Sequence, residues 1–530
     1  MVNFIFWATL IIYVLVSLFL ARYIRNVKDY YVMGERANTL WITGSLTASY
    51  LSGVTFVGIA GIVYLNGPPI FLLVYGSWIG MVIAILYVGR RLRAFGSMTM
   101  PDYIQRRYGT SVSIVATIIL IVGLLGYGLV QLMSAGVLLS AVTGTSYTTM
   151  IIAFSIALIF FCATAGMWSV VVTDTLMMIT ILIACFVVAP IVVGKGGGFE
   201  GITTGLMQKS PLFWSSGGAA LKMPVGWSIG QFVLWSVFFP AAPWICMRAF
   251  PCRNDFVLMR SIAWSTLLAT TTVTVLYLGV GATYLLNPSI KPPDQVFVWA
   301  CQTQVGSFLG GMGIAGIMAA ILSTAATIFI AAGFGLSRDL YERLAARDVS
   351  EKQKIFHARI AQVIVGCIVF VIALFKPLSI YWVGAWSGAL FATAWMPMLV
   401  AGFEWRRVTR QGAYASMILG LGSYVLLYQM VRVWKMFKLP LNIDPIIFGI
   451  IISCVIIWIV SLLTKAKEGD LAMFDQLETI QLSGETMKGF SAPGSLQKEI
   501  GITKKTAWAV IVISIIFFGW LIMKIVPAVS

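Results

Sequence analysis

The chain has 530 residues, of which 59% are hydrophobic and only 10% are charged. Soluble domains carry about a quarter of charged residues, so this composition excludes a soluble globular protein. Apolar windows of about 20 residues recur along the whole length, and each is long enough to cross a bilayer as a helix. The runs are continuous instead of alternating, which excludes an outer-membrane barrel. The sequence therefore predicts an all-α membrane protein.

Fourteen membrane spans are predicted from apolar windows and their charged or Gly/Pro-rich ends. The stretch 465–505 between the last two spans is polar, and we expect a cytosolic linker or a short surface helix there. The spans begin near residues 3, 38, 70, 112, 147, 169, 226, 260, 306, 355, 378, 413, 445 and 506.

The distribution of basic residues predicts the orientation. No charge precedes the first span, whereas Arg22, Arg25 and Lys28 follow it, which indicates an outside N-terminus. With that orientation, three quarters of the 36 lysines and arginines fall in inner connections, including 248–260, and the C-terminus is also outside. The net charge of +17 is then mainly a topology signal. We expect a multi-pass protein of the cell membrane (plasma or inner) that contacts anionic lipid and binds no nucleic acid.

Two predicted spans are interrupted. The second contains small and hydroxylated residues from Thr47 to Gly53, and the seventh contains Pro240 and Pro243. These interruptions lie five spans apart, and interrupted helices at corresponding positions of two halves point to an inverted-repeat transporter. The alternative is a pair of kinks that the helix packing tolerates.

The ninth span places Ala320, Ser323, Thr324 and Thr327 on one helical face. A carbonyl and three hydroxyls on one face could hold a sodium ion, with unwound backbone of the second span supplying further carbonyls. The alternative is that the hydroxyls bond their own i−4 carbonyls or join helices.

Asp174 is the one clear carboxylate inside a predicted span, and no lysine or arginine is expected at comparable depth. A membrane-embedded acid indicates a functional site, although Asp174 could instead cap a helix near the cytosolic end. The only histidine, His357, falls among inner-loop charges. One deep carboxylate and one histidine are too few groups for acid–base or metal catalysis. We therefore expect no catalytic residues, no organic cofactor and no metal other than sodium.

Several motifs resemble the sodium:solute symporter family over roughly residues 1–430. They are the segments 48–53 (ASYLSG), 99–103 (TMPDY), Thr173-Asp174 after 165–167 (AGM), and Ala320-x-x-Ser323-Thr324 followed by 337–341 (SRDLY). The resemblance implies a LeuT-like core built from two inverted repeats of five helices. The implied division is an extra helix and inner loop at 1–37, a ten-helix transporter core at 38–430, and three C-terminal helices with the linker at 431–530.

The resemblance also implies a sodium site. Its ligands would be the carbonyls of Ala48, Leu51 and Ala320 and the hydroxyls of Ser323 and Thr324. Some members hold a second sodium at an acid equivalent to Asp174 and at hydroxyls that include Thr327. Ala326 lacks the hydroxyl that such members have, so Asp174 and Thr327 are expected to form either a second sodium site or the ion's exit path.

The solute is expected to bind between the broken helices and the eleventh span. Ala242 stands where sugar carriers have an amide, which disfavours a sugar, and the segments 242–248 and 402–412 resemble the pantothenate and monocarboxylate branch. An amino acid, a sugar or a quaternary amine held by Trp244, Trp382 and Trp386 are the alternatives. Each candidate could also be core packing. The candidates are Thr55, Phe56, Tyr75, Gln131, Pro243, Trp244, Trp382, Trp386 and Ser387.

The predicted function is sodium-coupled import of a small organic solute by alternating access, performed by a monomeric unit. A lipid-modifying enzyme, a channel, or a sensor on a transporter scaffold are the rival classes. The sequence offers no set of nucleophile, base or metal ligands that such an enzyme would need. A channel would be expected to show a pore lining repeated over several helices.

Overall fold

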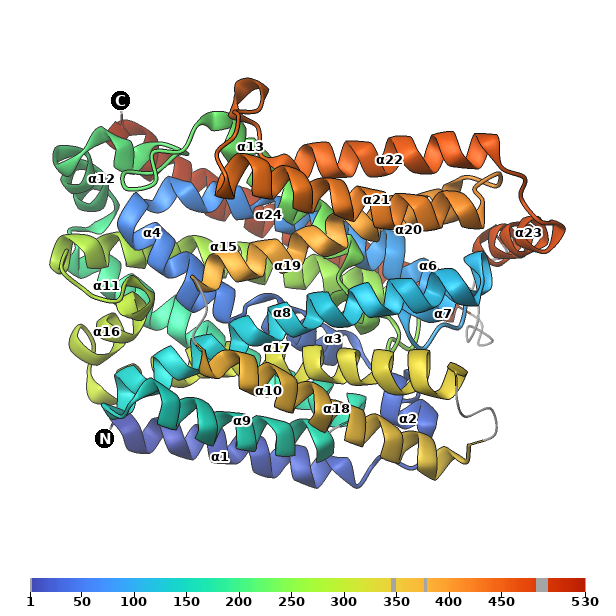
Figure 1. The fold of residues 1–530 in the computed structure, drawn as a ribbon. Helices are drawn as coiled ribbons and strands as arrows, with labels where there is room; N and C mark the ends of the chain where they lie inside the picture. The colour runs from blue at the N-terminus through green and yellow to red at the C-terminus, as the bar shows by residue number, and fades with distance from the viewer. Residues whose placement is uncertain (1, 165, 345–348, 376–378, 483–493, 530) are drawn as a thin grey trace.

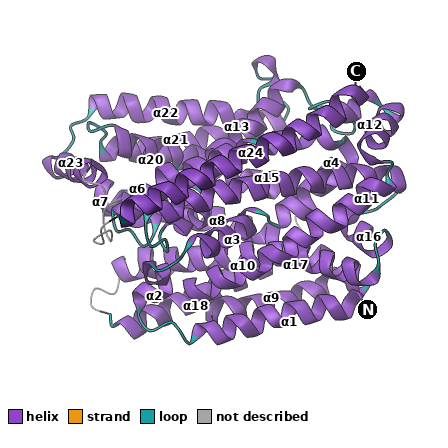
Figure 2. Cartoon of the chain, turned by 180° about the vertical axis from the view of Figure 1, so that it is seen from behind, coloured by secondary structure: helices purple, strands orange, loops and turns teal. Residues whose placement is uncertain are grey.

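The computed structural model describes residues 2–529 except 165, 345–348, 376–378 and 483–493, and these form one helical bundle (Figures 1 and 2). The described residues contain no strand, only an isolated pairing of Ala37 with Cys252. The helices are α1 (Val2–Ala21), α2 (Val27–Val32), α3 (Thr39–Tyr50), α4 (Ala60–Asn66), α5 (Gly76–Ile83), α6 (Arg90–Ala94), α7 (Met100–Tyr108), α8 (Thr110–Thr143), α9 (Tyr147–Thr164), α10 (Met167–Ile183), α11 (Ala189–Lys195), α12 (Gly198–Lys209), α13 (Val225–Ala241), α14 (Pro243–Cys246), α15 (Asp255–Leu286), α16 (Val296–Thr303), α17 (Ser307–Phe334), α18 (Glu351–Leu374), α19 (Ile380–Ala394), α20 (Met396–Glu404), α21 (Arg410–Tyr428), α22 (Pro445–Leu463), α23 (Glu468–Leu482) and α24 (Ser495–Val529).

The membrane spans follow the predicted order. Among the described residues, ten helices are long and apolar enough to cross a bilayer, and two bent pairs do so together. The other two predicted spans correspond to α9 and to the continuous helical run 76–94, which comprises α5, the π-helical turn η4 (Ala84–Gly89) and α6. The predicted all-α membrane architecture is therefore confirmed.

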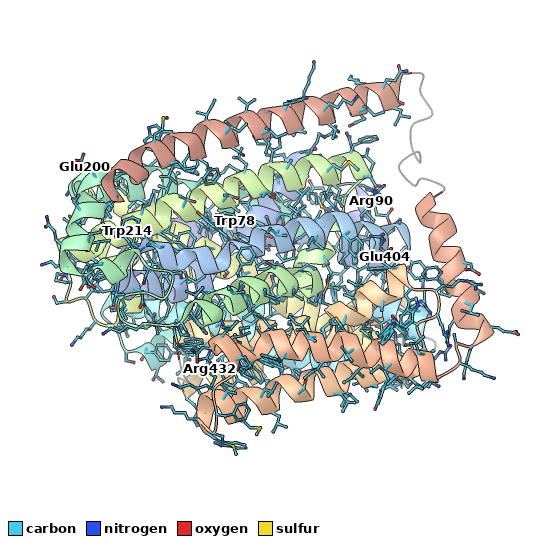
Figure 3. All side chains as sticks on the ribbon, turned by 90° about the horizontal axis from the view of Figure 1, so that it is seen from above. Trp78, Arg90, Glu200, Trp214, Glu404 and Arg432 are labelled. Atoms are coloured by element: carbon cyan, nitrogen blue, oxygen red, sulfur yellow. The ribbon has the colours of Figure 1, made fainter. Side chains whose placement is uncertain are left out.

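Both ends of the chain lie at one end of the bundle, and α23 lies at the other (Figures 1 and 2). Seen from above, Glu200 and Trp214 mark the first end and Arg90 and Glu404 mark the opposite end (Figure 3). An even number of spans requires both termini on one side. We call the end that contains the termini the outer end, following the predicted orientation.

The two broken spans are the predicted ones. In the first, α3 and the segment Val54–Asn66, which begins with the π-helical turn η2 (Val54–Ile59), meet at 46°. In the second, α13 and the segment Pro243–Ala249 meet at 53°. The residues at the breaks have nearly the same extended backbone: Leu51 has φ −78° and ψ 105°, and Ala242 has φ −79° and ψ 111°. This similarity fits two halves of one inverted repeat.

Polar side chains cap the helices that start at the inner end. Asn38 accepts from the Trp41 amide before α3, and Asn254 accepts from the Val257 amide before α15. Thr409 does the same for α21, and Ser350 begins a capping box for α18. Each cap satisfies an amide that has no partner within its helix, which fixes where the span begins.

Small residues allow close packing at the centre of the bundle. A Cβ at Gly44 of α3 would lie 2.5 Å from Thr175 Oγ1 and 2.7 Å from the Thr175 Cα on α10. A Cβ at Gly316 of α17 would lie 2.5 Å from the Thr180 carbonyl, also on α10. Such contacts bring backbones together as in other membrane bundles. The apolar part of the span Ser307–Glu342, which begins with α17, is completely buried.

The predicted linker 465–505 contains a docked helix, α23. Asp470, on α23, forms an ion pair at 2.6 Å with Arg410 at the start of α21, and Asp475 forms one at 2.7 Å with Arg406. The Arg406 guanidinium lowers the pKa of Asp475 by hydrogen bonding. Residues 483–493 of this linker lie outside the described residues. The last helix begins at Ser495, before the predicted start near 506.

We expect Gly44→Val to destabilise the fold, because the added side chain would force α3 away from the α10 backbone. Overpacking of this kind costs about 1–3 kcal/mol. Gly422→Val on α21 is the matched control, since an added Cβ there meets nothing within 4 Å. Thermal unfolding of the purified protein should show a lower midpoint for Gly44→Val alone. Equal midpoints for the two variants would contradict the close crossing.

Candidate sodium and solute sites

The break in α3 leaves two carbonyls without their helical partners. In a continuous helix, Ser52 N would bond the Ala48 carbonyl and Gly53 N the Ser49 carbonyl. Instead, Ser52 N donates to Thr55 Oγ1 at 3.3 Å, and Gly53 N donates to Gln131 Oε1 at 2.9 Å. The carbonyls of Ala48 and Ser49 are therefore free to face α17.

Hydroxyls of α17 meet these carbonyls. Ser323 Oγ lies 2.9 Å from the Ala48 carbonyl and 3.2 Å from the Ala320 carbonyl. Thr324 Oγ1 lies 3.0 Å from the Ala320 carbonyl and 3.3 Å from the Ser49 carbonyl. Oxygen ligands at about 2.4 Å from a hard cation lie about 3.4 Å apart when they are at right angles. These hydrogen-bonded oxygens of α3 and α17 are therefore close enough together to be candidate ligands of one small cation.

Four of the five predicted sodium ligands thus converge. The fifth, Leu51, is the extended residue that ends α3, with its amide bonded to the Thr47 carbonyl. The Ser49 carbonyl was not predicted, and it lies where α3 faces Thr324. The bonds of Ser323 and Thr324 to the Ala320 carbonyl also fit the alternative of hydroxyls bonding within their own helix. Their reach across to α3 is the part that this alternative does not explain.

Asp174 lies in the middle of α10 and is 1% exposed. It is therefore neither a helix cap nor a solvated side chain, and that alternative is wrong. Its Oδ2 accepts from Ser45 Oγ at 2.8 Å and from Arg248 Nη2 at 2.8 Å, with Ser49 Oγ at 3.5 Å. A buried carboxylate requires such partners to offset its loss of hydration.

Arg248 contradicts the expectation that no cation lies at comparable depth. The sequence places it in the basic inner connection 248–260, but it is completely buried in the 3-10 turn η7 (Met247–Ala249) after the second break. The segment Pro243–Ala249 is bent by 53° from α13 and contacts α3, and the guanidinium reaches the Asp174 carboxylate. Its Nη2 also donates to Ser49 Oγ at 2.9 Å and to Thr327 Oγ1.

The ion pair lies next to the candidate sodium site, and Ser49 joins the two. Its carbonyl accepts from Thr324, while its hydroxyl accepts from Arg248. Thr327 makes a second link, because its hydroxyl accepts from Arg248 and donates to the Ser323 carbonyl at 2.9 Å. Asp174 and Thr327, predicted as a second ion site or exit path, are therefore brought together around a guanidinium.

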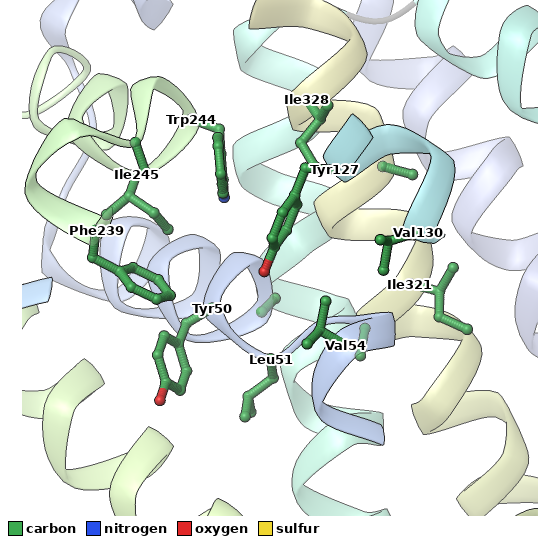
Figure 4. Packing of buried hydrophobic residues seen from close by; sticks show 14 of the residues in the cluster. Tyr50, Leu51, Val54, Tyr127, Val130, Phe239, Trp244, Ile245, Ile321 and Ile328 are labelled. Atoms are coloured by element: carbon green, nitrogen blue, oxygen red, sulfur yellow. The ribbon is translucent and has the colours of Figure 1, made fainter. Parts of the chain in front are cut away.

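A small cavity lies on the other side of the α3 break. Its volume is about 20 Å³, which is room for about one water molecule. Aromatic rings surround it, and Figure 4 shows Tyr50, Tyr127 and Phe239 around the break at Leu51 and Val54. Admission of an organic solute therefore requires these rings to move. The lining residues are Tyr50, Val54, Thr55, Ile59, Val74, Ser77, Tyr127, Trp235, Phe239, Val273 and Tyr277.

The predicted solute residues do not all lie at the central cavity. Thr55 lines the central cavity, and Gln131 holds the amide at the break. Tyr75 bonds Thr274 at 3.2 Å beside the cavity, whereas Phe56 packs on Phe297, away from it. Ser387 bonds its own helix through the Val383 carbonyl at 2.9 Å.

The predicted aromatic cage does not converge on one cavity in this conformation. Pro243 begins α14, and Trp244 next to it is buried against Tyr127, with ring centroids 4.8 Å apart. Trp382 and Trp386 instead line a separate cavity nearer the outer end. The sequence analysis missed Tyr50, Ser77, Tyr127, Trp235 and Tyr277 as lining residues. Two of them carried a usable signal: Tyr50 lies within the predicted interruption, and Tyr127 lies one helical turn before Gln131.

Removing either member of the buried ion pair should be more harmful than removing both. Breaking a buried pair leaves an uncompensated charge and costs about 3–5 kcal/mol. Asp174→Asn and Arg248→Met should each lower the unfolding midpoint and the folded yield. The double variant should recover part of the loss in a double-mutant cycle. Additive losses would mean that the two side chains do not stabilise each other.

Comparisons with known proteins agree with this architecture. Residues 30–420 match the model of the sodium:solute symporter family. The high-affinity proline transporter PutP of Bacillus subtilis is 24% identical over 484 residues, covering 88% of this chain and 98% of the relative. The sodium/proline symporter of Escherichia coli is 25% identical over 475 residues, covering 86% of this chain and 91% of the relative.

Solved structures show the same fold. A Na⁺-coupled sialic acid symporter in a substrate-bound outward-open state matches with a TM-score of 0.75 at 16% identity, covering 88% of this chain and 98% of that one. The nucleobase-cation-symport-1 transporter Mhp1 matches with a TM-score of 0.54 at 10% identity, covering 85% of this chain and 99% of that one. The predicted LeuT-like core is thereby confirmed. With the family model covering most of its length, this chain belongs to the sodium:solute symporter family.

Proposed function

We propose that this chain imports a small zwitterionic amino acid together with sodium, and that proline is the first solute to test. The observation that carries the sodium part is the pair of freed α3 carbonyls beside the α17 hydroxyls. The relatives support the solute, because those reported above are proline carriers. They favour the amino-acid alternative over the expected monocarboxylate or pantothenate-like acid.

The central cavity suits a solute without net charge. Its lining has hydroxyls and aromatic rings but no charged side chain among the described residues. In our proposal, an ammonium group would face carbonyls at the end of α3, and a carboxylate would face the amides that begin η2. A monocarboxylate would bring a net negative charge with no counterion in this lining.

The free energy available from sodium entry also favours a solute without net charge. One sodium entering through about 100 mV supplies about 2.3 kcal/mol, and a roughly tenfold sodium gradient adds about 1.4 kcal/mol. A zwitterion could then be accumulated roughly 500-fold per sodium. A monoanion would lose about 2.3 kcal/mol against the potential, which leaves about tenfold.

The proposed cycle begins with sodium entering from outside. The ion draws α3 and α17 together through the cage and favours the solute-loaded, occluded state. Ser49, Asp174 and Ser45 form a polar route from the cage toward the inner end of α3. We propose that Asp174 and Thr327 serve ion release along this route, with Arg248 as the charge that competes with sodium for the carboxylate.

Uptake into proteoliposomes tests the function. A labelled panel of proline, pantothenate, pyruvate, acetate, choline and glucose would be offered with and without an inward sodium gradient. We expect proline to accumulate only with the gradient, and the others not to accumulate. Sodium-driven uptake of pyruvate or pantothenate without proline uptake would instead support the hypothesis of a monocarboxylate or pantothenate-like substrate. Equal uptake without sodium would remove the proposed coupling.

Hydroxyl removal tests the sodium cage. Ser323→Ala and Thr324→Ala should each raise the half-saturating sodium concentration about tenfold or more, because a hydrogen-bonding group next to a charge contributes about 1.5–3 kcal/mol. Thr283→Ala is the control, since this buried hydroxyl bonds only its own helix at 2.8 Å. Unchanged sodium activation in both cage variants, with normal membrane insertion, would refute the assignment.

A further inference from the structure

An exposed hairpin joins α21 to α22. We call residues 434–443 the outer hairpin; it projects from the side of the bundle beside α13 (Figures 1 and 2). Trp434, Met436 and Leu441 are 61%, 62% and 83% exposed, and Lys435 and Lys438 are interspersed with them. Large apolar side chains mixed with lysines suit the headgroup region of a bilayer, where rings enter the boundary and amines reach water.

A basic cavity of about 450 Å³ lies between this hairpin and the segment before α13. Lys222, Arg432, Lys435 and Lys438 line it, and no acidic residue does. None of the three lysines makes an ion pair with a carboxylate of the described residues. Arg432, at the outer end of the α21–α22 pair (Figure 3), is partly neutralised by Asp444 at 3.3 Å. The cavity therefore presents an excess of positive charge.

Backbone strain is concentrated at the same place. Lys222 has φ 47°, Lys435 has φ 53° and Asn442 has φ 52°, and all three line the cavity. Leu441 beside them has φ 54°. These four make up most of the described non-glycine residues with positive φ. Such conformations are costly for residues with a Cβ and collect at binding sites, so the surrounding fold must stabilise the backbone at Lys222 and Lys435.

A second cavity of about 380 Å³ adjoins the basic one, because Arg432 lines both. Its walls come from α13, α19 and α21, with Trp382, Trp386, Tyr424 and Tyr428 among the lining side chains. Tryptophan and tyrosine are typical of the membrane interface. A basic chamber followed by an aromatic chamber suits an amphipathic ligand with an anionic head.

We propose that these two cavities bind an anionic phospholipid. Its phosphate lies among Lys222, Lys435 and Lys438, and its glycerol and upper acyl chain run past Arg432 along Trp386 and Tyr428. A small soluble anion would use the positive charge but would leave the exposed hairpin and the aromatic chamber without a role.

The site also contacts the transport core. Asp444 accepts from Arg432 and from Gln231 Nε2 on α13, both at 3.3 Å. Tyr381 of α19 donates to Gln231 Oε1 at 2.9 Å. The bound lipid therefore touches a polar chain that passes through Gln231 of α13, the helix that carries the second break, and ends on Tyr381 of α19.

Lipid titration followed by native mass spectrometry tests the proposal. The full-length protein in detergent is titrated with dioleoylphosphatidylglycerol or with dioleoylphosphatidylcholine. In the triple variant Lys222→Gln, Lys435→Gln, Lys438→Gln, we expect the affinity for phosphatidylglycerol to fall at least tenfold and the preference for it to disappear. The matched control is Lys195→Gln, Lys209→Gln, Lys291→Gln, which removes the same charge from exposed sites at the same end. It should stay within twofold of the wild type.

Two further arms separate the alternatives. Glycerol 3-phosphate in hundredfold excess should not displace the bound phosphatidylglycerol; displacement would assign the cavity to a soluble anion and overturn the lipid proposal. Equal losses in both triple variants would reduce the effect to net charge and also overturn it. If the cavity variant does not fold, Trp434→Ser with Lys435→Gln replaces it, because both side chains are exposed, and unchanged lipid preference there refutes the site.

Discussion

Backbone carbonyls inside a membrane need partners, and this constraint organises the centre of the fold. Where α3 stops at Leu51, the carbonyls of Ala48 and Ser49 lose their amide partners, and no water is available in a bilayer core to replace them. The hydroxyls of Ser323 and Thr324 on α17 take that place. In the proposed function, a sodium ion would bind these same oxygens and would thereby strengthen the contact between α3 and α17.

The buried pair of Asp174 and Arg248 extends this constraint to the second repeat. Arg248 follows the break between α13 and α14, whereas Asp174 lies on α10 in the first repeat. Their 2.8 Å contact therefore ties the two halves together at the level of the cage. A buried charge without its partner is strongly destabilising. Ser49 contacts both Arg248 of this pair and Thr324 of the proposed sodium site.

Close packing makes these contacts possible. Gly44 and Gly316 let α3 and α17 approach the α10 backbone to a distance that a Cβ would prevent. The central cavity is correspondingly small, about 20 Å³, because Tyr50, Tyr127 and Phe239 fill the space beside the break. If the proposed solute binds in this cavity, its entry must rearrange side chains at the α3 break, next to the proposed sodium site.

Sequence patterns alone predict the membrane class, the order of fourteen spans, the two breaks and the face of α17 that bears Ser323 and Thr324. These features depend on hydropathy, on Pro and Gly positions and on helical periodicity, which are local properties. Contacts between distant segments were needed to find that Arg248 is buried against Asp174, that the Ser49 carbonyl meets Thr324, and that Trp382 and Trp386 line a cavity away from Trp244. Those outcomes depend on how separate helices meet, and a charge at the end of a span looks the same in sequence whether it points to water or folds back into the core.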